Sequence, residues 1–266
     1  MVAVKVRLFG SLAVDGSEGP VRLGPREERA VLAMLLVQPG RVLPLDQLIG
    51  QLWADEPPPG AVATVQRYIS RLRRALGPGV LVARGPGYLV DVGPDQVDVS
   101  RFLAHAEAGR RALAAGDPAA AVAVLDEALA EWTGDPLAEF AGEPFAGPAI
   151  AHLENVHAEA VQDRAEARLL RGDVGWCVTE LGQLVRDHPY RERLWELYAA
   201  ALYRAGRPAD ALAALRRVRE LLDEELGLAP GPGLRAVEQA ILRHDEAAIP
   251  GVPAPPGPSA GQLDRL

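Results

Sequence analysis

The sequence predicts a mixed fold, in which an α+β domain is followed by an all-α domain. Apolar residues alternate with a period of two near the N-terminus, and they recur with a helical period over most of the remaining chain. In addition, a short segment near residue 170 recurs 34 residues later. We place the α+β domain at residues 1–97, the helical domain at residues 98–245 and a disordered tail at residues 246–266.

The N-terminal residues are expected to form a strand that pairs with a later segment. Val4, Val6 and Leu8 alternate with polar residues, which is the pattern of a strand with one buried face. We predict a turn at residues 14–16 and a returning strand at residues 21–23.

Two helices follow this strand pair. The first opens at Gly24-Pro25, where Glu27 and Glu28 favour the positive end of the helix dipole, and it ends at Pro39-Gly40. The second spans residues 45–53, and the three prolines at residues 57–59 prevent its continuation.

A third helix is predicted at residues 60–76, because Val65, Ile69, Leu72 and Leu76 recur at steps of four, three and four. Residues 81–84 and 88–90 then form a hairpin around Gly85-Pro86-Gly87. Strands, three helices and a hairpin in this order are typical of a winged helix-turn-helix.

The helical domain shows a repeat. Residues 169–173 and 203–207 each form a turn before a helix with an apolar stripe, and a 34-residue period of paired helices is typical of tetratricopeptide-like folds. The tail is rich in proline, glycine and alanine and has too little apolar bulk to pack. The predicted helices span residues 102–115, 119–132, 150–171, 176–187, 193–205, 209–226 and 234–243.

Charge is distributed unevenly along the chain. The net charge is −8, but residues 1–97 hold 11 basic and 9 acidic side chains, whereas residues 98–245 hold 16 basic and 25 acidic ones. Residues 57–90 contain five arginines and no acid. The single lysine, Lys5, has no phosphate-loop setting, and the apolar runs are too short for a membrane span. We expect a cytoplasmic protein with no membrane partner.

The arginines of the third helix are the candidate site, because a helix fits the major groove and a guanidinium matches the acceptors of guanine. Arg71 is the first choice for a base contact, while Thr64 and Gln66 suit a base or a phosphate. A run of arginines on a helix is more often a solvated face, so this pattern alone does not establish DNA binding. The residues expected to contact double-stranded DNA are Thr64, Gln66, Arg67, Arg71, Arg73, Arg74, Arg84 and Tyr88.

Other chemistry-bearing residues have structural interpretations. The lone Cys177 lies next to Trp176 on a helix and is expected to be a core residue, and His152 and His157 fall on different helix faces. Val90 stands where a dinucleotide-binding motif needs its third glycine. We therefore expect no catalytic residues, no metal site and no cofactor, and we do not expect an enzyme.

The chain resembles the Streptomyces antibiotic regulatory protein (SARP) family over residues 3–245. This family joins an OmpR-type winged helix to a bacterial transcriptional activator domain. The resemblance lies in the third-helix string TVQRYISRLRRAL at residues 64–76 and in three later strings: HPYRERLW at 188–195, ALYRAGR at 201–207 and ELGLAPGP at 225–232. Larger relatives carry a nucleotide-binding or a phosphopeptide-binding domain after this unit, and this sequence stops before either.

The resemblance implies a transcriptional activator that binds direct repeats at promoters, as a homo-oligomer on tandem sites, and recruits RNA polymerase holoenzyme to a biosynthetic gene cluster, such as one for an antibiotic. A different class remains open. The helical repeats could instead serve a protein-interaction adaptor, in which the winged helix docks a partner.

Overall fold

The computed structural model describes residues 4–54 and 56–251, which form two compact units. Unit 1 comprises Met1–Ala108 and Asp126–Ala160, and unit 2 comprises Gly109–Leu125 and Val161–Leu266. Helices α4 (Asp98–Ala114), α5 (Pro118–Ala130) and α6 (Gly147–Arg171) each contribute residues to both units. The compact units therefore cross the sequence-based boundary at residue 97.

The first sheet of unit 1 is antiparallel, with strand order β1-β2-β3. These strands are β1 (Lys5–Arg7), β2 (Ala13–Gly16) and β3 (Gly19–Pro20). The prediction of a turn at residues 14–16 is wrong, and the returning strand is Gly19–Pro20 rather than residues 21–23, although the Val21 N–H does pair back to the Val14 carbonyl at 2.8 Å. Val14 is buried opposite Val6, and the two-residue turn lies after Gly16, which pairs with Gly19.

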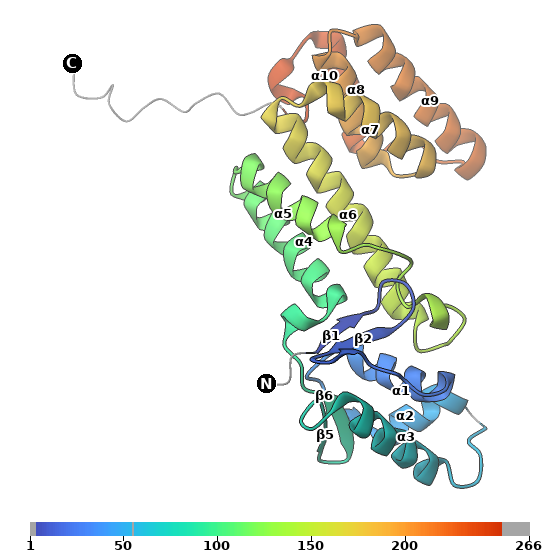
Figure 1. Ribbon diagram of the computed structural model, residues 1–266. Coiled ribbons are helices and arrows are strands. Elements are labelled where there is room, and N and C mark those ends of the chain that lie inside the picture. Colours follow the sequence, from blue (N-terminus) through green and yellow to red (C-terminus); the bar gives the residue numbers. More distant parts are fainter. Residues whose placement is uncertain (1–3, 55, 252–266) are drawn as a thin grey trace, which may run out of the picture. The chain divides into compact units, whose positions relative to one another are not determined.

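Three helices and a second sheet complete the N-terminal part of unit 1 (Figure 1). Helix α3 buries Val65, Ile69, Leu72 and Leu76, as predicted from their spacing. The strand order of the second sheet is β4-β6-β5, and its short edge strand β4 was not predicted. The elements are α1 (Arg26–Leu36), β4 (Leu43–Pro44), α2 (Leu45–Trp53), α3 (Ala61–Leu76), β5 (Leu81–Arg84) and β6 (Gly87–Val90).

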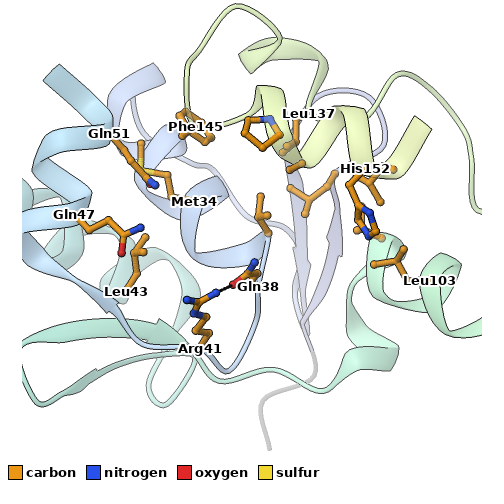
Figure 2. A pocket seen from close by; sticks show the side chains of 16 residues that line it. Met34, Gln38, Arg41, Leu43, Gln47, Gln51, Leu103, Leu137, Phe145 and His152 are labelled. Atoms are coloured by element: carbon orange, nitrogen blue, oxygen red, sulfur yellow. Dashed lines mark hydrogen bonds between the residues drawn. The ribbon is translucent and has the colours of Figure 1, made fainter. Parts of the chain in front are cut away.

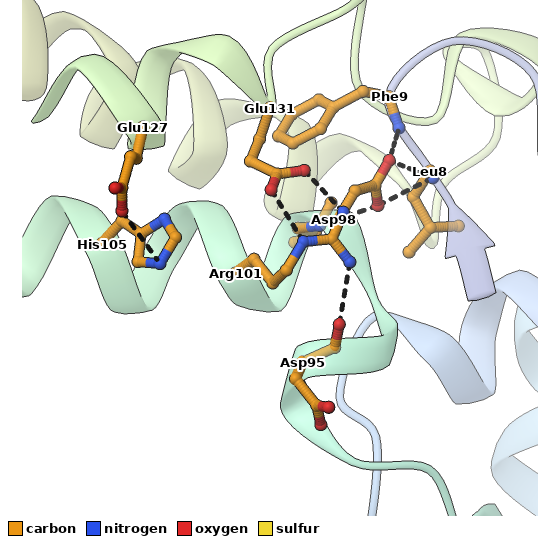
Figure 3. A network of polar contacts seen from close by, with 9 residues as sticks. Leu8, Phe9, Asp95, Asp98, Arg101, His105, Glu127 and Glu131 are labelled. Carbon is orange, nitrogen blue, oxygen red and sulfur yellow. Dashed lines mark hydrogen bonds and ion pairs between the residues drawn. The ribbon is translucent and has the colours of Figure 1, made fainter. Parts of the chain in front are cut away.

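Asp98 joins the N-terminal strand to the helical part of unit 1 (Figure 3). Its buried carboxylate accepts hydrogen bonds from the backbone N–H groups of Leu8 (2.8 Å), Phe9 (3.0 Å) and Val99 (2.7 Å). Burial raises the pKa of Asp98, and these N–H donors offset part of that rise. One turn later, Arg101 makes a two-pronged pair with Glu131, with N–O distances of 2.7 and 2.6 Å.

Further contacts bind the same two parts of unit 1. Arg29 of α1 pairs with Glu139 in the 3₁₀ helix η2 (Ala138–Phe140), and the backbone N–H of Leu137 donates to the Leu8 carbonyl at 2.8 Å. Phe9 packs against Trp132, with ring centroids 4.7 Å apart. The first part of the helical segment is thus packed on the N-terminal strands, which explains why both belong to one compact unit.

Unit 2 is helical, and its core is built from alanine, leucine and valine side chains of paired helices. Gly172 and Gly206, 34 residues apart, both have positive φ, and each turn closes with the same pair of backbone hydrogen bonds. Its other elements are α7 (Val174–Asp187), α8 (Glu192–Arg204), α9 (Pro208–Leu226), α10 (Pro232–Arg243) and the 3₁₀ helix η3 (Glu246–Ala248). The α+β part followed by a mostly helical part confirms the predicted mixed fold.

The prediction of a disordered segment is wrong for residues 246–251. Residues Glu246–Ala248 form η3, and Ile249 is buried in the core of unit 2. Arg204 also donates to the Gly251 carbonyl at 2.5 Å, so this stretch is folded against the helices. The sequence-based prediction missed this because the average composition of residues 246–266 is poor in large apolar side chains, and a single residue, Ile249, makes the core contact. The prediction for residues 252–266 lies outside the described residues.

Candidate nucleic-acid interface

Helix α3 presents one face to solvent because its apolar stripe faces the core. Gln66, Arg67, Ser70 and Arg74 are exposed, while Thr64 is half-buried in the first turns of the helix. Arg67 reaches back to the Thr64 hydroxyl, with a donor–acceptor distance of 3.5 Å. The exposed face therefore combines guanidinium groups with amide and hydroxyl groups, which can donate to base edges or to phosphates.

Arg71 also lies on this face, and its guanidinium forms an ion pair with a buried carboxylate of α1. Its Nη1 lies 2.6 Å from Oε1 of Glu28, on α1. The Arg71 side chain is 50% exposed, whereas the Glu28 side chain is 3% exposed. The pair fixes the direction of the guanidinium and offsets part of its charge, so Arg71 reaches the surface as a positioned group.

Glu28 is the site residue that sequence reasoning missed. The sequence places Glu28 at the positive end of a helix, outside the acid-free stretch at residues 57–90. However, Glu28 precedes Val31 by three positions and Leu32 by four, which places it on the buried stripe of α1. A carboxylate on an apolar stripe needs a cationic partner, and that requirement could have led to Arg71.

The hairpin β5–β6 lies against the C-terminal half of α3. Arg73 donates from Nε to the Leu81 carbonyl at 3.0 Å, and its guanidinium carbon lies 5.7 Å from the Tyr88 ring centroid. Gly87 permits the close approach of β4, because an added Cβ would lie 2.2 Å from the Leu43 carbonyl oxygen. The hairpin is therefore fixed to both α3 and β4.

The structure brings most of the predicted site residues to one surface, formed by α3 and the hairpin. Arg84 is exposed at the end of β5, beside the turn at residues 85–86. A shallow groove runs between α3 and the hairpin. It is lined by Gln66, Ile69, Ser70, Arg73, Arg74, Gly77, Pro78 and Tyr88.

The other chemistry-bearing residues lie away from this surface: Cys177 is in the core of unit 2, His157 is half-buried and His152 is exposed on α6. Cys177 is buried, and burial raises the pKa of its thiol to about 11. His157 stacks on Trp132, with ring centroids 4.2 Å apart. Within residues 4–54 and 56–251, no three histidine, cysteine, aspartate or glutamate side chains are grouped as metal ligands. In the same residues, no helix has both the length and the apolar character that crossing a bilayer requires.

Family comparisons agree with the division of the chain into an α+β part and a helical part. Residues 18–90 match the family described as "Transcriptional regulatory protein, C terminal", and residues 97–242 match the "Bacterial transcriptional activator domain". The second match covers more than half of the chain.

Several curated relatives share this arrangement. EmbR of Mycobacterium tuberculosis is 39% identical over 239 residues, which are 88% of this chain and 61% of EmbR. AfsR of Streptomyces coelicolor is 40% identical over 242 residues, or 87% of this chain and 24% of AfsR. DnrI of Streptomyces peucetius is 34% identical over 253 residues, which cover 91% of this chain and 93% of DnrI.

A solved structure of M. tuberculosis EmbR, in complex with a low-affinity phosphopeptide, has a TM-score of 0.87 to this chain at 38% identity. The match covers 92% of this chain and 66% of that one. The chain thus spans about three fifths of the length of EmbR, while it matches nearly all of DnrI. With both domain matches and these relatives, the chain belongs to the SARP family of transcriptional regulators, which join an OmpR-type winged helix to a bacterial transcriptional activator domain.

Proposed function

We propose that this chain is a transcriptional activator that binds promoter DNA through α3 and the β5–β6 hairpin. The observation that carries the proposal is the exposed face of α3, where Gln66, Arg67, Arg71 and Arg74 project from a helix whose opposite stripe is anchored in a core. A helix of this kind fits the major groove of B-DNA, and an arginine that meets guanine there discriminates by about 1–3 kcal/mol.

The residues divide into base readers and phosphate holders. Arg67 and Arg71 lie one turn apart on the exposed face, and Glu28 orients Arg71, so both suit base edges. Thr64 and Gln66 suit a base or a nearby phosphate. Arg73 and Arg74 lie at the C-terminal end of α3 beside the hairpin, where phosphate contacts set the register of the protein on the duplex. Arg84 suits the adjacent minor groove, and Tyr88 suits a sugar or phosphate.

We propose further that residues 98–245 contact RNA polymerase holoenzyme rather than DNA. Their 25 acidic and 16 basic side chains give a charge of −9, which disfavours contact with phosphates. Membership of the SARP family supports activation in the cytoplasm, at direct repeats occupied by more than one copy of the chain. The relatives AfsR and DnrI, both from Streptomyces, make a biosynthetic gene cluster the expected target.

The test begins with DNA fragments selected by the full chain from genomic DNA, followed by mobility-shift titrations of single variants. We expect Arg71→Ala to weaken binding and to relax the preference at one base position. Arg74→Ala should weaken binding to all sequences alike and reduce the slope of log K against log salt by about 1.

Arg243→Ala is the matched control, because Arg243 is an exposed arginine at the end of α10 in the acidic part of the chain. It should leave the base preference unchanged, and the affinity unchanged at 150 mM salt. If Arg71→Ala and Arg74→Ala bind like the parent, the assignment of the surface is wrong. If the parent selects no sequence at all, the proposal of promoter binding fails as a whole.

A further inference from the structure

Unit 1 contains a cavity that the proposed DNA-binding surface does not use. Its volume is about 490 Å³, within the range of roughly 300–1,000 Å³ typical of small-molecule sites. Its lining comes from α1, α2, α4 and α6, together with Leu8 after β1 and the segments that follow α1 and precede α6. No residue of α3, β5 or β6 lines it among the described residues, so its occupant would be distinct from DNA.

One part of the lining is apolar. Met34, Leu137 and Leu153 are buried, and Leu103 and Phe145 are half-buried beside them. In Figure 2, Phe145 and Leu137 stand across the cavity from Leu43 and Gln47. This lining offers an aromatic ring and aliphatic side chains, so it favours a ligand with an apolar body.

The other part of the lining is polar and carries positive charge. Gln47 and Gln51 project from α2 one turn apart, and His152 projects from α6 (Figure 2). Arg41 also lines the cavity, and its guanidinium donates to the side-chain oxygen of Gln38. Of the described residues that line the cavity, none is an aspartate or a glutamate. The lining therefore combines one fixed positive charge with amide and imidazole groups.

We propose that this cavity binds a small amphipathic organic anion, with an aromatic or aliphatic body on the apolar lining and a single acidic group near Arg41. A guanidinium matches a carboxylate or a sulfonate with charge-assisted hydrogen bonds. The amides of Gln47 and Gln51 can donate to the polar atoms of the same ligand. Such a ligand touches α2 of the winged helix and α6 of the helical segment at once.

The probe is 8-anilinonaphthalene-1-sulfonate, which carries two aromatic ring systems and one negative charge. Titrated into the full chain and followed by its fluorescence, it should bind with a stoichiometry of one. Arg41→Gln should weaken this binding by about tenfold, because a charge-assisted contact is lost. The uncharged analogue N-phenyl-1-naphthylamine should bind the parent and Arg41→Gln alike.

Two kinds of control separate this site from general dye binding. Arg22→Gln removes an exposed arginine of unit 1 that does not line the cavity, and it should bind both probes like the parent. Ala149→Trp and Gln47→Trp each fill the cavity from a different helix. Circular dichroism checks that each variant is folded, and either folded variant should abolish the binding of both probes.

Three results would overturn the proposal: neither probe binds the parent, Arg41→Gln binds the sulfonate as tightly as the parent does, or a folded cavity-filling variant still binds both probes. No DNA is present in these titrations. Their outcome is therefore independent of whether α3 reads a promoter.

Discussion

Arg71 of α3 and Glu28 of α1 are coupled, because the Glu28 carboxylate is nearly excluded from water and its partner comes from the surface. Removing Arg71 leaves that carboxylate buried without its cation. We expect Arg71→Ala to lower the free energy of unfolding by about 1–3 kcal/mol, the usual cost of an unsatisfied buried group. Arg67→Ala, which truncates an exposed side chain, should change it by less than about 0.5 kcal/mol. Urea unfolding followed by circular dichroism measures both.

The double variant Glu28→Gln/Arg71→Ala is the control for this pair. A neutral amide costs less to bury than a lone carboxylate. Adding Glu28→Gln to Arg71→Ala should therefore recover part of the stability that Arg71→Ala removes. Strictly additive losses would show that the two side chains are not coupled. DNA affinities of Arg71→Ala are best compared with those of the double variant, since both lack the guanidinium.

Cys177 is the single cysteine of the chain and is buried in the core of unit 2. Burial raises the pKa of its thiol from 9.0 to about 11, which lowers its thiolate fraction at pH 8 by about 100-fold. The folded chain should therefore react with a disulfide reagent at least that much more slowly than the chain in denaturant. Equal rates would show that Cys177 is exposed in solution.

The raised pKa of Cys177 also predicts how the stability of the folded chain depends on pH. Since the folded-state pKa lies above the unfolded one, the stability that comes from the neutral thiol is fully present below pH 9 and is lost as pH rises toward 11. The difference in stability between the parent and Cys177→Ala should therefore shrink over this range. It should be constant between pH 7 and pH 8.

The turns of the helical repeats depend on glycine at a positive φ, and this dependence can be tested by substitution. Gly206 has φ of +73° in the turn between α8 and α9, a conformation that costs an L-residue about 1–2 kcal/mol. Gly206→Ala should lower the free energy of unfolding by that amount. The matched control is Gly175→Ala, at an exposed position of α7 with open space around its Cα, which should be neutral or stabilising by up to about 1 kcal/mol.

Elements with a clear period were the ones that the sequence predicted well. Helix α3 and the turns at Gly172 and Gly206 follow from local spacing and from glycine, and the structure confirms them. Strand β4 has two residues, one of them proline, so it has no period to detect, and it exists only because β6 pairs with it. Short strands of this kind are decided by tertiary contacts.

The candidate site shows the same division. Thr64, Arg67, Arg71 and Arg74 could be placed on one helix face from sequence, because side chains three and four positions apart share a face. The ion pair to Glu28 joins residues 43 positions apart, and the anchor from Asp98 to Leu8 joins residues 90 apart. Each depends on how α1, β1 and α4 pack, and no local pattern records that packing.

For the molecule as a whole, and given the proposed DNA binding, the separation of charge along the chain should affect the affinity for DNA. Residues 57–90 carry five arginines, while residues 98–245 carry a charge of −9. Phosphates attract the first segment and repel the second. Repulsion at long range does not distinguish one sequence from another, so it should lower affinity for every duplex equally.

A triple variant on the exposed face of α9, Glu220→Gln/Asp223→Asn/Glu224→Gln, tests this consequence, because it changes the net charge from −8 to −5 without touching the winged helix. At 10 mM salt, where the screening length is about 30 Å, we expect tighter binding to a selected fragment and to a scrambled duplex by the same factor. At 150 mM salt, where it is about 8 Å, the gain should nearly vanish. Fluorescence anisotropy of both duplexes measures the ratio, and a gain confined to the selected fragment would mean that α9 takes part in reading sequence.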